Sequence, residues 1–358
     1  MSDTSRRLQL ETSDALLAAG VSKPVFDCRW PETRRVAERL WRELPEGLAE
    51  RLYGAPYRGG QDQLHEAFLE RWLHWRREVV TLDESAFPHR YATAGSSEGI
   101  RECIAQFSVD RRAVGREPVM HVFDGEYEGY AAYAAAYAVR VERHDRPSWR
   151  ESFPRASSDV FHRDLWMLSQ PSAIDGNLWA EFPDFLRQLE HASPGVRVAV
   201  DLTYVGTVAR AYEVDVTSPL IDTLFFSLSK VFGVYYHRVG GVLSRSVMAG
   251  IVGNRWFKNT FSLELGRELL ASHAVRAIPT AYTDCQAKAT AEVGATLGLP
   301  LVASDAVLIA HHPWRSGLPP LVAGLRRGTA VRYCLTPMLD RLLFGHADDT
   351  AAVDHRRR

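Results

Sequence analysis

A lysine stands between small hydroxyl residues at the end of an apolar segment. Residues 221–226 have the composition of a buried strand, and Ser227-Leu228-Ser229-Lys230 follows directly. A charged amine is costly to bury, so burial lowers the pKa of a lysine and makes its amine a nucleophile. Arg238 lies eight positions after Lys230, and hydroxyl groups with a guanidinium fork are suited to binding phosphate. The segment therefore indicates a nucleophilic lysine beside an anion site.

A second anion site is predicted at Gly95-Ser96-Ser97, between a strand-like run and a helical segment. Backbone N–H groups at the start of a helix, together with the helix dipole, bind anions. The same residues also suit an ordinary strand-to-helix turn with serine caps, and the motif alone leaves both readings open.

Asp201 ends the strongly apolar segment 196–201. A carboxylate at the end of a buried strand costs several kcal/mol unless a cation or hydrogen-bond donor is beside it. A protonated pyridine nitrogen is one such partner. Tyr204 lies three residues further on and could reach the same ligand. A helix cap is the alternative role for Asp201.

Tyr127 and Arg332 are the remaining candidates. Tyr127 follows the strand-like segment 119–123, where its ring could stack on a flat cofactor, although packing in the core is the alternative. Arg332 lies in the strand-like segment 330–335. A buried guanidinium there matches a carboxylate bidentately, and an exposed ion pair is the alternative.

These candidates must be positioned by a sheet, because apolar strand segments alternate with helical segments from residue 91 to residue 226. Such alternation predicts an α/β fold, a mainly parallel mixed sheet sandwiched by helices, with ligands at the carboxyl ends of the strands. We expect residues 1–52 to form an N-terminal arm and part of the small domain. Residues 53–245 are expected to form the large domain and 246–358 a smaller α+β domain.

Composition narrows the function classes. The chain of 358 residues is 46% hydrophobic and has a formal net charge of −1, so no basic surplus points to nucleic acid. No apolar run is long enough to span a membrane. The four cysteines are widely spaced, which favours neither a disulfide framework nor a zinc site. No signal peptide is recognised, and a reducing, cytoplasmic setting is expected.

The order of these candidates along the chain is more specific than any one of them. An anion cradle, a stacking aromatic, a strand-end aspartate, a lysine, an arginine eight residues later and a late arginine follow one another. This constellation resembles the fold type I pyridoxal-phosphate enzymes, specifically the class I/II aminotransferase group that includes histidinol-phosphate aminotransferase. The resemblance covers roughly residues 50–340.

The resemblance implies a role for each residue. Lys230 would form the Schiff base with pyridoxal 5'-phosphate, Asp201 would pair with the pyridine nitrogen, and Tyr204 would donate to the phenolic oxygen. The implied phosphate ligands are Ser96, Ser97, Ser227 and Arg238; Tyr127 would stack on the ring and Arg332 would bind the substrate α-carboxylate. A tyrosine from the partner subunit of a homodimer, with Tyr53 the better match and Tyr57 the second, would also reach the phosphate.

One turn departs from the family pattern. The family has an Asn-Pro-x-Gly turn after the fourth major strand, whereas this chain reads Ser169-Gln170-Pro171-Ser172-Ala173-Ile174-Asp175-Gly176-Asn177. The asparagine position falls on Ala173, or on Ser172 if the loop shifts. A hydroxyl could replace part of the asparagine's contact and a methyl group could not. The change leaves cofactor binding expected and the reaction type open.

The sequence is therefore interpreted as a pyridoxal-phosphate-dependent aminotransferase that acts on an amino acid. A lyase, decarboxylase or cyclase of specialised metabolism on the same fold is the alternative, because the same electron sink serves each bond cleavage at Cα. A non-catalytic binding protein is a third reading. It is disfavoured because the lysine, the aspartate and both arginines are all present.

Overall fold

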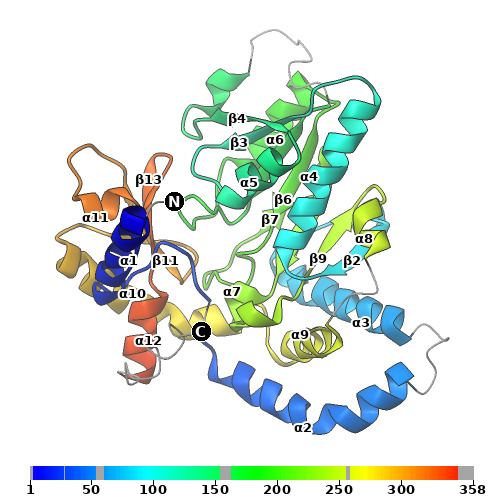
Figure 1. Ribbon diagram of the computed structural model, residues 1–358, viewed down its shortest axis with the longest axis horizontal. Helices are drawn as coiled ribbons and strands as arrows, with labels where there is room; N and C mark the ends of the chain where they lie inside the picture. Colours follow the sequence, from blue (N-terminus) through cyan, green and yellow to red (C-terminus); the bar gives the residue numbers. More distant parts are fainter. Residues whose placement is uncertain (1–2, 28, 54–59, 154–162, 255–258, 346–358) are drawn as a thin grey trace.

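A seven-stranded sheet runs through the larger part of the molecule (Figure 1). Its strands, in spatial order, are β2 (His89–Thr93), β9 (Gly240–Ser244), β8 (Ile221–Ser227), β6 (Arg197–Asp201), β5 (Leu165–Ser169), β3 (Val119–Phe123) and β4 (Arg140–His144). Within this sheet β9 is antiparallel to both of its neighbours, and the other described pairings are parallel. The prediction of a mainly parallel mixed sheet is confirmed.

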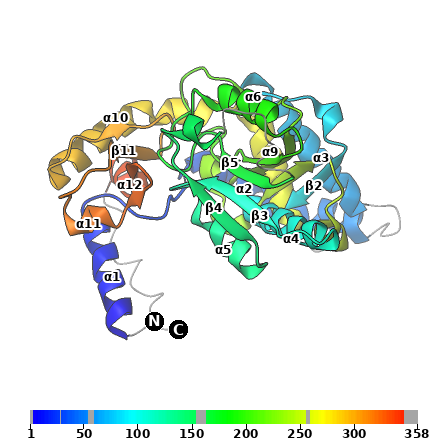
Figure 2. The same ribbon diagram turned by 90° about the horizontal axis from the view of Figure 1, so that it is seen from above.

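The structure is a computed structural model that describes residues 3–27, 29–53, 60–153, 163–254 and 259–345. Helices cover both faces of the large sheet (Figure 2). Helices α4 (Ser96–Ala113) and α5 (Glu128–Ala136) lie on one face, and α6 (Phe182–Ala192), α3 (Gly60–Trp75) and α9 (Thr260–Ser272) lie on the other. Side chains alternate along each strand, so neighbours such as Phe225 and Phe226 belong to apolar clusters on opposite faces.

Helix α3 is held on the sheet by aromatic packing. Trp72 stacks on Phe226 of β8, with ring centroids 3.9 Å apart. Phe68 and Trp75 on the same stripe are also buried, so this stripe is core, as the helical spacing indicates. Helix α2 (Pro31–Tyr53) is one continuous helix that contacts α9. The backbone remains helical through Pro45.

A smaller antiparallel sheet lies at one end of the molecule. Its order is β10 (Val302–Ala303), β11 (Ile309–Pro313), β13 (Ala330–Cys334) and β12 (Arg326–Arg327). Helices α1 (Asp3–Ala18), α10 (Ala277–Leu297), α11 (Pro320–Ala323) and α12 (Thr336–Phe344) gather around it (Figure 1). A single bridge joins Ser22 to Cys334, so the N-terminal segment is tied to this sheet. The α/β fold class with a smaller α+β unit is confirmed.

Short elements complete the described chain. These are α7 (Ser229–Phe232), α8 (Ala249–Gly253), the pair β1 (Val80–Thr81) and β7 (Val214–Asp215), and 3-10 turns at 76–78, 84–86, 149–152 and 235–237. Strand β11 begins three residues later than the apolar run 306–310 suggests. None of the helices in the described part is both long and apolar enough to cross a lipid bilayer.

Candidate active site

The carboxyl ends of five parallel strands meet at one edge of the large sheet. Strand β2 leads to Ser96, β3 to Tyr127, β5 to Ala173, β6 to Asp201 and β8 to Lys230. Strand β9 runs the opposite way, so Arg238, two residues before its start, lies at the same edge. A pocket of about 520 Å³ is lined there by Pro24, Val25, Phe26, Ser96, Ser97, Tyr127, Glu128, Tyr133, Ala173, Asp201, Thr203, Tyr204, Ser227, Ser229, Lys230, Tyr235, Arg238 and Arg332.

Asp201 is buried at the base of this pocket, with 6% of its surface exposed. Its Oδ1 accepts a hydrogen bond from the backbone N–H of Thr203 at 3.0 Å and lies 2.5 Å from that residue's hydroxyl. Its Oδ2 accepts a hydrogen bond from the hydroxyl of Tyr130 at 3.3 Å. Burial raises the pKa of Asp201 to about 6 despite these donors. A cation beside the carboxylate would favour its ionised form.

Lys230 is the second residue of the short helix α7, directly after β8. Burial lowers the pKa of Lys230. Its Nζ donates a hydrogen bond to the backbone oxygen of Val25, which brings the N-terminal segment to the pocket wall. Nζ also lies 5.8 Å from the centre of the Tyr235 ring. An amine with a depressed pKa carries more of its nucleophilic neutral form at pH 7 than an exposed lysine does.

One wall of the pocket is rich in donors suited to an anion. Ser96 and Ser97 begin α4, and Gly95 before them has φ of +78°, a backbone region open to glycine. A Cβ at Gly95 would lie 3.0 Å from Nη2 of Arg238. Arg238 donates from Nη2 to the backbone oxygen of Ala94 at 3.1 Å, and Ser227 lines the same pocket. The helix start and the guanidinium therefore converge on one cradle.

Arg332 enters the pocket from β13 of the smaller sheet. It is 6% exposed, and burial lowers its pKa. It donates from Nη1 to the backbone oxygen of Ala173, and its Nε has no hydrogen-bond partner among the described residues. The alternative role considered for Arg332, an exposed ion pair, is therefore wrong. A buried guanidinium with spare donors is suited to a carboxylate ligand.

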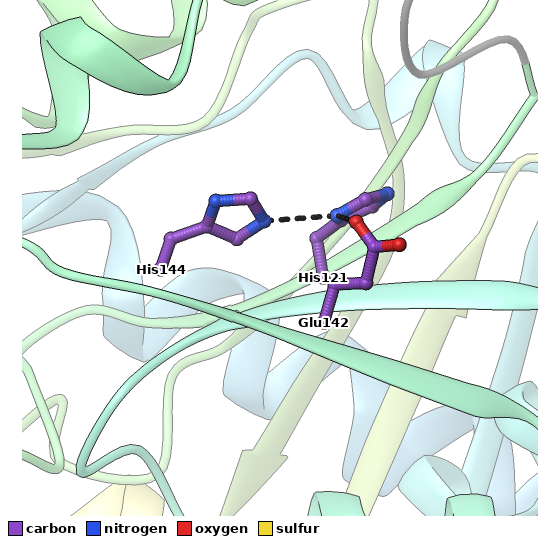
Figure 3. A group of neighbouring side chains, drawn as sticks. All are labelled: His121, Glu142 and His144. Carbon is purple, nitrogen blue, oxygen red and sulfur yellow. Dashed lines mark hydrogen bonds and ion pairs between the residues drawn. The ribbon is translucent and has the colours of Figure 1, made fainter.

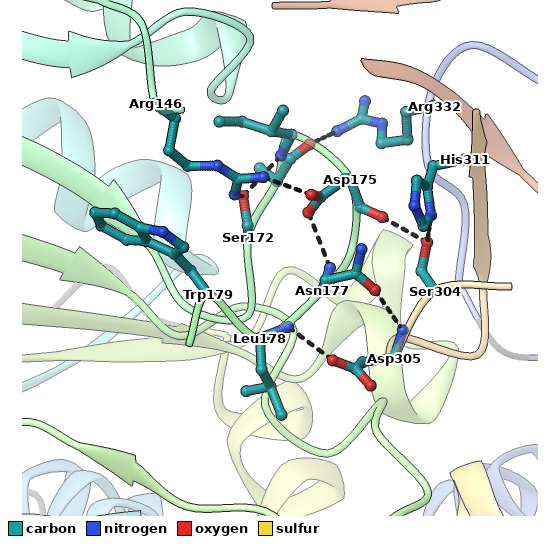
Figure 4. A network of polar contacts seen from close by, with 12 residues as sticks. Arg146, Ser172, Asp175, Asn177, Leu178, Trp179, Ser304, Asp305, His311 and Arg332 are labelled. Carbon is teal, nitrogen blue, oxygen red and sulfur yellow. Dashed lines mark hydrogen bonds and ion pairs between the residues drawn. The ribbon is translucent and has the colours of Figure 1, made fainter. Parts of the chain in front are cut away.

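The turn after β5 is held by side chains of both sheets (Figure 4). Arg146 donates to the Ser172 hydroxyl at 2.8 Å and pairs with Asp175 at 2.5 Å. Ser172 points into this network and Ala173 lines the pocket, so the methyl group occupies the position where the resemblance expects an asparagine. No side-chain amide or hydroxyl from residues 172 and 173 reaches the pocket.

The same turn is joined to the smaller sheet. The backbone N–H of Asp305 donates to Oδ1 of Asn177 at 3.0 Å, and Asp305 in turn accepts from the backbone N–H of Leu178 at 2.9 Å. The Ser304 hydroxyl donates to the backbone oxygen of Asp175 at 2.5 Å (Figure 4). These contacts fix the turn relative to the strand that carries Arg332.

Two aromatic candidates also line the pocket. Tyr127 packs edge-on against Tyr130, with ring centroids 5.5 Å apart. Tyr204 is buried, and desolvation raises its pKa to about 12, so its hydroxyl keeps its proton at neutral pH. The side chain of Tyr53, the last residue of α2, and the whole of Tyr57 lie outside the described residues.

Sequence reasoning missed several residues of the site. Thr203 and Tyr130 orient Asp201 by hydrogen bonds. Thr203 lies two residues after Asp201, and Tyr130 lies three residues after Tyr127, so both could have been found by their spacing from predicted site residues. Glu126 is buried behind the pocket, where its carboxylate accepts from the Ser169 hydroxyl at 2.5 Å. Burial raises the pKa of Glu126 to about 7. The contact between Val25 and Lys230 could not be predicted from the sequence, because it depends on how the N-terminal segment packs.

Comparison with solved structures shows which fold this is. A "probable N-succinyldiaminopimelate aminotransferase" from Thermus thermophilus superposes with a TM-score of 0.65 over 93% of this chain and 95% of its own, at 19% identity. The chain has the fold of these aminotransferases. An aminotransferase from Mycobacterium tuberculosis gives a TM-score of 0.62 over 92% of this chain and 95% of its own, at 16% identity.

A third aminotransferase-fold structure, an Escherichia coli protein described with a methionine aminotransferase function, gives a TM-score of 0.59. It covers 89% of this chain and 99% of its own, at 15% identity. Neither a protein-family model nor a curated protein sequence matches the chain. The similarity is therefore one of fold, and the site residues must carry the argument about function.

Proposed function

We propose that this protein is a pyridoxal-phosphate-dependent aminotransferase that acts on an amino acid. The observation that supports the proposal is that Asp201, Lys230 and Arg332 line one pocket although they come from three different strands or their ends. Each of these three side chains is costly to keep charged in this environment unless a ligand or partner compensates for the lost hydration. A cofactor with a cationic ring nitrogen and an aldehyde, together with an amino acid whose carboxylate lies beside it, would satisfy all three.

The pocket residues fit the cofactor. Asp201 would hold the pyridine nitrogen, Lys230 the aldehyde carbon, and Ser96, Ser97, Ser227 and Arg238 the phosphate. Tyr127 would stack on the ring, and Tyr204 would donate to the phenolic oxygen. When bound, pyridoxal 5'-phosphate supplies an electron sink for bonds at the substrate Cα.

The residues of the chain would then act on the substrate. Arg332 binds the substrate carboxylate with its free donors and so orients Cα. Lys230 would act as the base that removes the Cα proton of the bound substrate with Nζ and as the acid that returns it. Asp201, ionised beside a cationic ring nitrogen, would favour the protonated form of that nitrogen. Asp201 and Arg332 are buried, whereas Lys230 is partly exposed at the pocket.

We further propose a homodimer with shared active sites and a cytoplasmic location. In this proposal a tyrosine from the partner subunit, Tyr53 in preference to Tyr57, reaches the phosphate. The free Cys103, Cys285 and Cys334 are consistent with a reducing compartment.

The test is the absorbance of the purified protein with pyridoxal phosphate. We expect a band in the near-ultraviolet to violet that is lost in Lys230→Ala or after borohydride treatment. Addition of an amino acid substrate should convert the band to that of the amine form of the cofactor. Lys288→Ala on α10, outside the pocket, should keep the band. A protein that remains colourless after reconstitution would overturn the proposal.

The second candidate is a lyase, decarboxylase or cyclase, and Ala173 favours it. The methyl group cannot hold the cofactor oxygen or the substrate carboxylate, so a different bond at Cα could be aligned with the ring. Single-turnover spectra with a panel of amino acids separate the two candidates. Release of product with the original band restored would support the second candidate, and accumulation of the amine form the first.

A further inference from the structure

Away from the pocket, two histidines and a glutamate meet on one face of the large sheet (Figure 3). His121 lies on β3, and Glu142 and His144 lie on β4, the edge strand. His121 is paired in register with Glu142, and residues two apart on a strand share a face. The sheet geometry therefore brings all three side chains together. None of them lines the cofactor pocket.

The distances among the ligand atoms suit one metal ion. Nδ1 of His121 lies 2.9 Å from Nε2 of His144 and 3.5 Å from Oε2 of Glu142. All three atoms lie within 4.8 Å of one another. Ligands placed about 2 Å from a tetrahedral Zn²⁺ are separated by about 3.3 Å. Small shifts of the imidazoles would therefore accommodate the ion.

A second carboxylate orients the central imidazole. Nε2 of His121 lies 3.1 Å from Oδ2 of Asp164, and Arg111 lies 3.6 Å from that carboxylate. A hydrogen bond from Nε2–H to Asp164 leaves the lone pair of Nδ1 directed toward His144 and Glu142. Metal-binding histidines characteristically donate their other ring N–H to a carboxylate in this way.

The central imidazole lies in a buried, aromatic environment. His121 is 2% exposed, and its ring stacks on Trp166 with centroids 5.2 Å apart. Neutral imidazole nitrogens and a carboxylate oxygen are the ligand set of several zinc sites.

We propose that His121, Glu142 and His144 bind a divalent transition metal, with Zn²⁺ the best fit to two imidazoles and one carboxylate. Asp164 is the positioning residue of this site. A bound ion would tie the edge strand β4 to β3. The proposal is independent of the proposed function, because it uses no residue of the cofactor pocket.

The experiment is a titration of the full-length, tag-free protein after removal of metals by a chelator. Zn²⁺ binding is measured by calorimetry and Co²⁺ binding by visible absorption, without free pyridoxal phosphate, which itself binds metals. We expect one site per chain and the visible bands of a tetrahedral Co²⁺ complex. Asp164→Asn should weaken Zn²⁺ binding roughly 10- to 100-fold, and His144→Gln and Glu142→Gln at least as much.

His89→Gln is the matched control, because His89 is half-buried on β2, the opposite edge strand of the same sheet. It should bind Zn²⁺ as tightly as the unmodified chain. Circular dichroism melts establish that each variant is folded. The proposal would be overturned if the unmodified chain did not bind Zn²⁺, or if folded His144→Gln bound Zn²⁺ as tightly as the control. His121 and His144 would then be only a hydrogen-bonded pair. The spectrum with pyridoxal phosphate tests the proposed function separately.

Discussion

Arg332 donates a hydrogen bond from Nη1 to the backbone oxygen of Ala173. The contact joins β13 of the smaller sheet to the turn after β5 of the large sheet. It uses one donor of the guanidinium and leaves Nε without a partner among the described residues. The backbone of the turn thus positions the arginine, while the side chain at residue 173 contributes no polar group.

Replacing Arg332 by lysine should weaken the binding of amino acid substrates. Lysine keeps the charge and loses the planar fork, so about 1.5–3 kcal/mol of charged hydrogen bonding is lost, or roughly 10- to 150-fold in affinity. Single-turnover spectra give the dissociation constant. Arg315→Lys, at an exposed position in the segment after β11, should leave it unchanged. Unchanged affinity in Arg332→Lys would show that the carboxylate binds elsewhere.

Gly95→Ala should weaken cofactor binding. The backbone at Gly95, with φ of +78° and ψ of 174°, is strained for any residue with a Cβ, at about 1–3 kcal/mol. The new methyl group would also press on Arg238, 3.0 Å away. Titration with pyridoxal phosphate, followed by absorbance, measures the loss.

Gly253→Ala is the control for that glycine, because a Cβ on Gly253 of α8 meets nothing within 4 Å. Its cofactor affinity should equal that of the unmodified protein. If both alanine variants bind the cofactor equally well, Gly95 does not shape the phosphate cradle.

The cofactor-free protein should lose stability as the pH rises from about 5 to 8, in part because of Glu126. Its pKa is raised to about 7 by burial, so the folded state binds the proton more tightly than the unfolded state. Stability is then fully present below about pH 4.3 and falls as the pH rises through 7, by on the order of 3 kcal/mol.

Glu126→Gln removes this contribution. Urea unfolding at pH 5 and pH 8 should show a smaller difference in the free energy of unfolding for the variant than for the unmodified chain. Glu190→Gln, at an exposed position of α6, should retain the full difference. An identical pH dependence in all three proteins would rule out a proton held at Glu126.

Arg146→Gln should loosen the turn after β5. Arg146 holds both Ser172 and Asp175, and the side chains of the ion pair are 17% and 13% exposed. We expect a loss of about 1–3 kcal/mol in the free energy of unfolding. Thermal melts and urea unfolding measure it.

Arg143→Gln on β4 provides the comparison. Arg143 lies 3.7 Å from Asp124, and both side chains are about half exposed. Surface pairs contribute about 0–1 kcal/mol, so this variant should be nearly as stable as the unmodified chain. Equal losses in the two variants would mean that the network in the turn has no special role in stability.

Much of the fold could be predicted because its signals are local. The apolar segment 119–123 predicts a strand, and β3 has the same bounds. Strand β9 had no such signal, because Gly240 and Gly241 begin it and glycine disfavours strands. The packing of α9 on α3 could not be read from periodicity, because the two helices are far apart in the chain.

The sequence by itself determined the residue types of the site and their order, because strand ends are marked by an apolar run followed by a polar residue. Asp201 and Lys230 were found in this way. Only the tertiary structure decided which strand ends are neighbours, that Arg332 faces them from a second sheet, and that Ala173 rather than Ser172 lines the pocket. The reason is physical: hydrophobic periodicity acts within one element, whereas the pocket and the His121 cluster depend on strand pairing between residues far apart in the chain.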